Sequence, residues 1–229
     1  ASLYSALFYP PPDATEIYVV GKQWMWKVQH PNGRREINAL HVPRGRPVKL
    51  TMTSEDVIHS FFVPAFRLKK DVVPGRYSTL WFEPTEAGTY HLFCAEFCGT
   101  DHAKMRGQVV VMEPERYSRW LQQGQPQRSI AASGQRLFRS YGCSGCHGAA
   151  ATVQAPDLTG IYGRTVPLQT GGTVIADDAY IRDSILLPRK QIAAGYAPIM
   201  PSYKDQISEA EILQIIAYLR SLSEAEGAR

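Results

Sequence analysis

Two short stretches of the chain gather side chains that can bind metals. Residues 94–105 follow the pattern Cys-x3-Cys-x3-His-x2-Met, which places two thiols, an imidazole and a thioether, all soft or borderline ligands, within twelve residues. Residues 143–147 form a Cys-x-x-Cys-His pattern, typical of covalent attachment of a c-type haem. The two stretches contain all four cysteines. We therefore expect a protein that carries electrons between two metal centres, with two disulfides as the alternative.

The ligand types of the first stretch favour copper over zinc. Structural zinc sites prefer cysteine pairs two to four residues apart that are closed by Cys or His. Met105 is a poor zinc ligand and a good copper ligand, but a single blue copper needs only one thiolate. Cys94 and Cys98 together exceed that need. Two thiolates can instead bridge two coppers that share one unpaired electron. Sharing the charge reduces the structural rearrangement of the centre that each electron transfer requires.

Such a dinuclear centre needs one more histidine than residues 94–105 supply. The best candidate is His59, which lies between apolar residues at the edge of a predicted strand. The alternative is that His59 is an ordinary structural histidine.

The second stretch predicts a haem with a complete set of ligands. Cys143 and Cys146 would form thioethers with the vinyl groups, and His147 would reach the iron from the same turn. A low-spin electron carrier needs a sixth ligand, and a thioether raises the reduction potential. Of the five methionines, only Met200 follows the haem pattern. The competing interpretation of the first part of the pattern is a redox-active disulfide.

The element that must position the first stretch is a β-sheet. Short runs rich in β-branched and aromatic residues are separated by Gly, Pro and Asn, and Pro31-Asn32-Gly33 predicts a hairpin turn. This spacing is typical of an all-β Greek-key sandwich or barrel. The predicted strands cover residues 16–20, 23–28, 39–43, 47–53, 60–63, 77–82, 88–94 and 107–112. The stretch 94–105 would then connect the last two strands.

The second half of the chain is predicted to be a small all-α domain. A helix over residues 115–123 closes the first half, and Ser133 is predicted to cap the helix that leads into the haem pattern. Asp177 would cap a helix over 177–187, and Ser208 with Glu211 forms a capping box for the last helix. So small a helical core usually needs an additional stabilising element, and a covalently attached haem would provide one.

Composition limits the remaining function classes. The chain has 229 residues, of which 44% are hydrophobic and 20% charged, as in globular proteins. The net charge of +4 gives no argument for nucleic acid as a partner. No window reaches the roughly 18–20 apolar residues that span a bilayer, so we expect the chain as given to be soluble.

The first half of the chain resembles subunit II of cytochrome c oxidase, whose extramembrane part is a cupredoxin-fold domain holding the dinuclear CuA centre. The resemblance covers residues 15–113. It rests on Gly-x-Gln-Trp-x-Trp at 21–26, Glu-Asp-Val-Ile-His-Ser at 55–60, Leu-Lys-x-Asp-x-x-Pro-Gly-Arg at 68–76 and the pattern at 94–105. It implies that Cys94 and Cys98 bridge both coppers. His59 and Met105 would complete one copper; His102 and the backbone carbonyl of Glu96 would complete the other.

The resemblance implies two further contacts of the copper domain. The Glu96 carboxylate would reach a magnesium ion at the interface with the catalytic subunit I. Trp24 matches the tryptophan through which the family accepts electrons, although Met25 follows it where the family commonly has tyrosine. The alternative is that Trp24 and Trp26 are packing aromatics of a strand.

The second half resembles a class I cytochrome c over residues 131–222, including the Pro156-Asp157-Leu158 stretch after the haem pattern. Together the two resemblances describe a caa3-type oxidase subunit II. They predict a cupredoxin-like CuA domain over 1–123, a linker over 124–130 and a cytochrome c domain over 131–229.

This architecture implies a function in respiration at the periplasmic face of a bacterial membrane. Electrons would pass from an external donor (a cytochrome c, a cupredoxin or an iron–sulfur protein) through haem c and CuA to subunit I, where oxygen is reduced. The chain itself would hold no oxygen-reducing site. The alternatives are a CuA subunit of a nitric oxide reductase and, in a different class, a copper-storage or chaperone protein.

Overall fold

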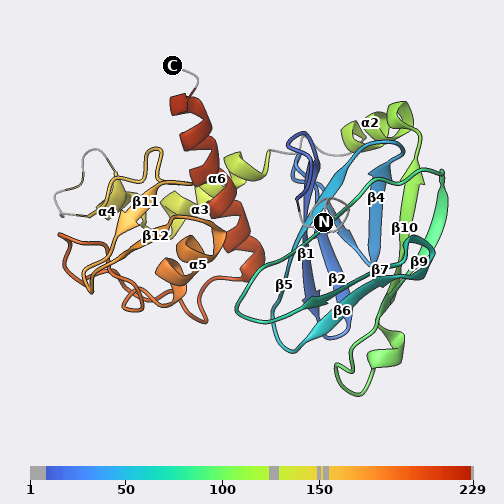
Figure 1. Ribbon diagram of the computed structural model, residues 1–229, viewed down its shortest axis with the longest axis horizontal. Helices are drawn as coiled ribbons and strands as arrows, with labels where there is room; N and C mark the ends of the chain where they lie inside the picture. The colour runs from blue at the N-terminus through green and yellow to red at the C-terminus, as the bar shows by residue number, and fades with distance from the viewer. Residues whose placement is uncertain (1–8, 124–128, 149–150, 152–154, 228–229) are drawn as a thin grey trace. The chain divides into compact units, whose positions relative to one another are not determined.

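A computed structural model describes residues 9–123, 129–148, 151 and 155–227 (Figure 1). The chain divides into two compact units, Ala1–Gln127 and Arg128–Arg229. Most of the predicted linker, residues 124–128, lies outside the described residues. None of the helices in the described ranges has the length and apolar character to cross a membrane.

The first unit is a sandwich of two five-stranded sheets. One sheet has the order β3 (Arg35–Ile37), β2 (Met25–Gln29), β1 (Thr15–Lys22), β5 (Val48–Ser54) and β8 (Ser78–Phe82). The other has the order β4 (Ala39–Pro43), β10 (Arg106–Met112), β9 (Gly88–Cys94), β6 (His59–Val63) and β7 (Leu68–Val72). The predicted hairpin turn joins β2 to β3, which pair antiparallel. The predicted all-β fold is confirmed, and β3 and β7 are strands that the pattern did not predict.

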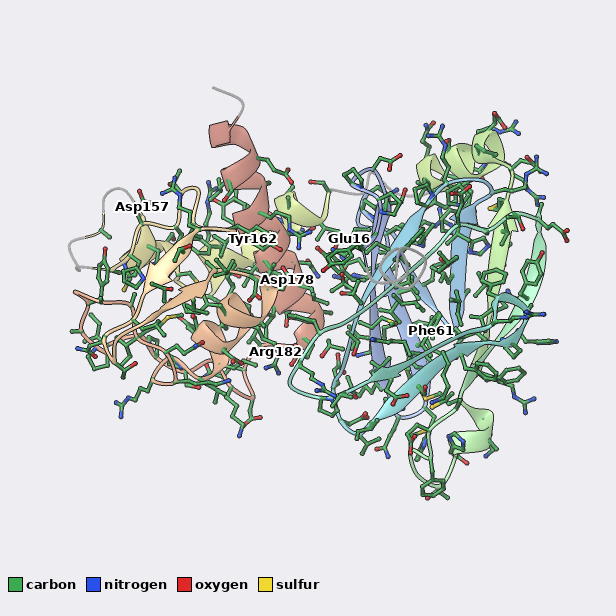
Figure 2. All side chains as sticks on the ribbon, viewed as in Figure 1. Glu16, Phe61, Asp157, Tyr162, Asp178 and Arg182 are labelled. Atoms are coloured by element: carbon green, nitrogen blue, oxygen red, sulfur yellow. The ribbon has the colours of Figure 1, made fainter. Side chains whose placement is uncertain are left out.

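The core of the sandwich comes from the inward faces of both sheets. Trp26, Leu50, Phe61 and Leu92 are fully buried there, and Phe61 is labelled in Figure 2. Burying each such side chain stabilises the fold by roughly 1.5–3 kcal/mol. The same buried cluster includes the side chains of Cys94, Cys98 and Met105. The sulfur ligands predicted from the sequence therefore lie at the edge of the apolar core and away from water.

Strand pairing fixes both ends of the loop that carries these sulfurs. β9 ends at Cys94, β10 begins at Arg106, and Phe93 pairs with Arg106 across the two strands. The Cys94 amide donates to the Met105 carbonyl at 3.0 Å, which closes the loop on itself. A short 3₁₀ turn, η2 (His102–Lys104), lies within it. β6 pairs with β9 through Phe61 and Cys94, so that the strand beginning at His59 lies beside the loop.

A polar cluster fastens helix α2 (Pro114–Gln122) to the sandwich. The Glu36 carboxylate accepts hydrogen bonds from His30 Nε2 at 2.7 Å and His41 Nδ1 at 2.5 Å. The Tyr117 hydroxyl of α2 lies 3.2 Å from His30 Nδ1, and the His41 ring stacks on Trp120 with 4.4 Å between centroids. Burial opposes ionisation of Glu36, but the two histidine hydrogen bonds outweigh it and lower its pKa to about 2.

The second unit is helical around a pair of crossed helices. Its elements are α3 (Ile130–Ser140), α4 (Ser144–His147), the short strands β11 (Thr165–Pro167) and β12 (Thr173–Ile175), α5 (Asp178–Leu186) and α6 (Glu209–Gly227). Figure 1 shows α3 beside α6. The crossing is closest at Gly134, where an added Cβ would lie 1.8 Å from the Gln214 carbonyl oxygen. Only glycine therefore permits this approach.

Two of the three predicted helix caps are correct. The Asp177 side chain accepts from the Tyr180 amide at 2.9 Å, and Ser208 and Glu211 exchange hydrogen bonds as a capping box. The cap predicted at Ser133 is wrong, because Ser129 caps α3 by accepting from the Ala132 amide at 3.1 Å. Ser133 lies inside the helix. Both serines precede a helix-compatible run, and the packing of Ile130 into the core favours the earlier start.

Candidate metal centres

The sulfur atoms of the first stretch converge in the first unit. Cys94 Sγ lies 3.8 Å from Cys98 Sγ, and Cys98 Sγ lies 3.8 Å from Met105 Sδ. All four cysteines of the chain are free thiols. Two metal–sulfur bonds of about 2.3 Å would span this Cys94–Cys98 separation at an angle of about 110°. The spacing therefore fits two thiolates that share a metal ion.

Two imidazoles complete the cluster, each beside a different thiol. His59 Nδ1 lies 3.9 Å from Cys94 Sγ, and His102 Nδ1 lies 3.4 Å from Cys98 Sγ. The ligand atoms of His59, Cys94 and Cys98 all lie within 4.8 Å of one another. The backbone carbonyl of Glu96 lies 3.3 Å from Cys94 Sγ. The structure thus brings together all six groups that the sequence nominated for copper.

Asp56 orients the imidazole of His59. One oxygen of its carboxylate accepts a hydrogen bond from His59 Nε2 at 2.8 Å, and the other accepts one from the backbone N–H of Gln23 at 2.7 Å. With its proton on Nε2, His59 turns the lone pair of Nδ1 towards Cys94, as metal-binding histidines with a carboxylate partner do. Burial raises the pKa of Asp56, but the hydrogen bonds from Gln23 and His59 outweigh it and lower the pKa overall.

The Gln23–Trp24 turn contacts the metal-binding loop directly. Gln23 Nε2 and Trp24 Nε1 both donate to the Cys98 carbonyl, at 2.8 and 3.2 Å. Gly99 lies under this contact with a φ of +115°, and an added Cβ would come within 2.8 Å of Gln23 Nε2. Trp24 is therefore one hydrogen bond away from the backbone of a predicted copper ligand.

The environment makes the two thiols unequal. Burial opposes ionisation of Cys94, but hydrogen bonds with His59 and backbone groups outweigh it and lower its pKa to about 6. Burial and the neighbouring Cys94 raise the pKa of Cys98. Thiolates are the metal-binding form of cysteine, so the site favours at least one ready ligand near neutral pH.

The side chains of Glu96 and Phe97 lie at the surface, and the Phe97 ring lies 5.8 Å from the His102 ring between centroids. Glu96 is exposed, and the Phe97 side chain is 76% exposed. The carbonyl of Glu96 and its carboxylate therefore face different surroundings, the first the buried sulfurs and the second the surface.

The second unit contains a cavity that the four predicted haem ligands line. It has a volume of about 220 Å³, and Cys143, Cys146, His147 and Met200 all contribute to its walls. His147 Nδ1 lies 2.9 Å from the Pro156 carbonyl oxygen, which can only accept a hydrogen bond, so Nδ1 carries the proton and Nε2 is left as the free ligand atom. The remaining walls are mainly apolar and come from α3, α5, α6 and the loop around Met200. The donor set and the apolar walls fit a covalently held haem.

Three supporting contacts were not anticipated from the sequence. They are the hydrogen bond of Asp56 to His59, the bond of Gln23 to the Cys98 carbonyl and the bond of His147 to the Pro156 carbonyl. Asp56 alone carried a local signal, since it precedes His59 by three residues in the motif at 55–60.

Comparison with known proteins gives a family for each unit. Residues 33–113 match the family described as cytochrome C oxidase subunit II, periplasmic domain, and residues 131–223 match cytochrome c. Cytochrome c oxidase subunit 2 of Alkalihalophilus pseudofirmus is 33% identical over 222 residues, covering 92% of this chain and 62% of that protein. Cytochrome c oxidase subunit 2 of Thermostichus vulcanus is 45% identical over 107 residues, covering 47% of this chain and 32% of the relative.

A solved structure is also similar to the first unit. The periplasmic domain of subunit II of cytochrome oxidase from Bradyrhizobium japonicum is 30% identical, covering 50% of this chain and 95% of that one, with a TM-score of 0.48. The chain spans less than two thirds of the length of the two curated relatives above. The chain therefore combines a unit that matches the cytochrome c oxidase subunit II family with a unit that matches cytochrome c, an arrangement that fits the caa3-type form of subunit II.

Proposed function

We propose that this chain is the electron-entry subunit of a haem–copper terminal oxidase. Electrons would pass from an external donor to haem c, from haem c to a dinuclear CuA centre, and from there to subunit I, which reduces oxygen to water. The proposal rests on the convergence of five side chains at the edge of the sandwich core. Each ligand atom lies less than 4 Å from the ligand atom of a neighbour in the set Cys94, Cys98, His59, His102 and Met105.

The ligand assignment follows the family pattern. Cys94 and Cys98 would bridge two coppers, which is supported by their 3.8 Å separation. His59 and Met105 would complete one copper; His102 and the Glu96 carbonyl would complete the other. A dinuclear copper centre supplies a single electron shared between two ions. The protein holds the ligands in a fixed arrangement, because strands β9, β10 and β6 anchor the loop and Asp56 orients His59.

The haem assignment rests on the cavity of the second unit. Cys143 and Cys146 would hold the haem through thioethers, with His147 and Met200 as axial ligands. A haem with these ligands supplies one-electron transfer at a raised potential. The His147–Pro156 hydrogen bond would leave Nε2 free for the iron, and the mainly apolar walls suit the porphyrin ring.

Two partners follow from the proposed role. Subunit I would receive electrons near Glu96, whose exposed carboxylate is the candidate ligand for a magnesium ion at that interface. An external donor would deliver electrons to the haem, and Trp24 is the candidate entry point for any donor that uses the copper centre directly. The complex would work at the periplasmic face of a bacterial membrane, in keeping with the family description.

Metal and haem analysis of the purified chain tests the proposal. We expect two coppers and one covalent haem for each chain, with an EPR signal of one electron shared between two coppers. A chain that holds zinc and no haem would overturn it. Oxygen and nitric oxide consumption by the intact complex then separates an oxidase from a nitric oxide reductase.

A further inference from the structure

The loop that carries Met200 is attached at its two ends and is free between them. On one side, the Ala194 amide donates to the Pro167 carbonyl at 2.8 Å. On the other side, Ser202 Oγ donates to the Leu186 carbonyl at 2.7 Å. Among the described residues, no hydrogen bond joins residues 195–201 to another segment, and Ile199 is 59% exposed. The position of Met200 therefore depends on how firmly the two ends are held.

Tyr203 extends the second attachment to the haem-attachment segment. Its hydroxyl donates to the Tyr141 carbonyl at 3.0 Å, and the two rings pack edge to face with 6.1 Å between centroids. Tyr141 lies two residues before Cys143, in the segment that carries the haem-attachment pattern. Tyr203 itself lies three residues after Met200 and lines the same cavity. One side chain thus connects the segments that carry the two predicted axial ligands.

The acceptor of this hydrogen bond is itself held in place. The Tyr141 hydroxyl donates to Glu211 Oε1 at 3.2 Å, and the other Glu211 oxygen accepts from Ser208 in the capping box of α6. The first turn of α6, the haem-attachment segment and the Met200 loop are therefore joined in one chain of contacts. Burial raises the pKa of Tyr203, so its hydroxyl keeps its proton and remains a donor.

We propose that Tyr203 is a positioning residue for Met200. Its hydrogen bond to Tyr141 sets the distance between the thioether-bearing loop and the haem-attachment segment, so that Met200 stays opposite His147. This inference rests on the proposed haem function. Without the hydroxyl, the Met200 loop opens more often, and a small external ligand competes better for the sixth position of the iron.

Titration of the ferric full-length chain with imidazole tests this role. We expect Tyr203→Phe to bind imidazole about three- to tenfold more tightly than the wild type, the range that one net hydrogen bond implies. The reduction potential of the haem should fall, because loss of thioether ligation lowers it. Haem content and the copper spectrum should stay unchanged. Tyr141→Phe keeps the carbonyl acceptor but loses the bond to Glu211, so it should show a smaller change in the same direction.

Tyr162→Phe is the matched control in the same unit. The Tyr162 hydroxyl is hydrogen-bonded to Asp178 at 2.9 Å, and both residues are labelled in Figure 2. Tyr162 is absent from the lining of the cavity. The Tyr162→Phe variant should lose stability as Tyr203→Phe does. Its imidazole affinity and haem reduction potential should stay at the wild-type values.

Three results would count against the inference. Unchanged imidazole affinity and potential in Tyr203→Phe would overturn it, as would equal shifts in Tyr203→Phe and Tyr162→Phe. A wild-type chain without a covalent haem would overturn the proposed haem function and this inference together. In a wild type with His–Met ligation, either of the first two results would overturn only the inference.

Discussion

The two candidate centres differ in how much of each the polypeptide builds by itself. At the copper site, thiols, imidazoles and thioether already lie within 3.4 to 3.9 Å of a neighbouring ligand atom. At the haem site, the ligands line a cavity of about 220 Å³, and Met200 lies on a loop with an exposed neighbour. Paired strands hold the first site, while the short helix α4 and the loop around Met200 carry the ligands of the second. The candidate copper ligands are thus preorganised, whereas the helical unit would use a haem as part of its core.

The largest expected effect is the loss of the haem. Replacing Cys143 and Cys146 by Ala should prevent covalent attachment of the haem and leave the cavity empty. At about 24 cal/mol for each Å³, an empty cavity of about 220 Å³ costs on the order of 5 kcal/mol. That is comparable to the whole stability of a small domain. We expect the helical signal of the second unit to be lost in circular dichroism.

The matched experiment removes copper from the wild type with a chelator. All four tryptophans lie in the first unit, so tryptophan fluorescence follows the sandwich alone. Its unfolding midpoint should change far less than that of the second unit in the double cysteine variant. A sandwich that unfolds on copper removal would contradict the difference between the two centres.

The second effect concerns how the sandwich is stabilised without metal. The pKa of Glu36 falls from 4.5 to about 2 on folding. A depressed carboxylate pKa adds stability that is fully present above pH 4.5 and is lost between pH 4.5 and about 2. Glu36→Gln should therefore cost about 3 kcal/mol at neutral pH and flatten the pH dependence in that window.

Denaturant unfolding of the copper-free chain, followed by tryptophan fluorescence, measures this effect. Glu113→Gln is a suitable control, because its ion pair with Arg44 is 48% exposed on both sides and should contribute little. An equal loss in both variants would show that the histidine cluster has no special role.

Much of the fold could be predicted because it depends on local patterns. The strands at 39–43 and 88–94 match the observed bounds, and the capping box of Ser208 and Glu211 is present. β7 was missed because its Lys–Lys–Asp centre lacks the alternation of a strand, and pairing with β6 overrides that preference. The bond from Gln23 to the Cys98 carbonyl joins residues 75 positions apart, so no local pattern encodes it. The ligand types were visible in the sequence, and the groups that orient them were not.

The third effect tests preorganisation at the copper site itself. Asp56→Asn should weaken copper binding about 10- to 100-fold, because an amide can present its N–H₂ to His59 and release the ring. The absorption and EPR spectra of the copper centre should change as well, which a general loss of stability would not cause. Competition with a copper chelator of known affinity measures the change.

Asp71→Asn is the control for that experiment. Asp71 accepts from Ser60 Oγ at 2.8 Å, one residue from His59, but touches no predicted ligand side chain. It should bind copper as the wild type does. If both variants weakened binding equally, the carboxylate contribution would be a matter of local charge and not of ligand orientation.

The smallest expected effect separates the two donors on the Cys98 carbonyl. Gln23→Met keeps the side-chain length and the backbone amide that Asp56 holds, and removes only the donor at 2.8 Å. Trp24 Nε1 still donates to the same oxygen at 3.2 Å. One net hydrogen bond is worth about 1 kcal/mol, so copper affinity should fall by about fivefold or less. Trp24→Phe removes the other donor and gives the matched comparison. Copper affinity could instead fall as much in Gln23→Met as in Asp56→Asn. That result would mean that the position of the Cys98 backbone contributes as much to the preorganisation of the copper site as the orientation of His59 does.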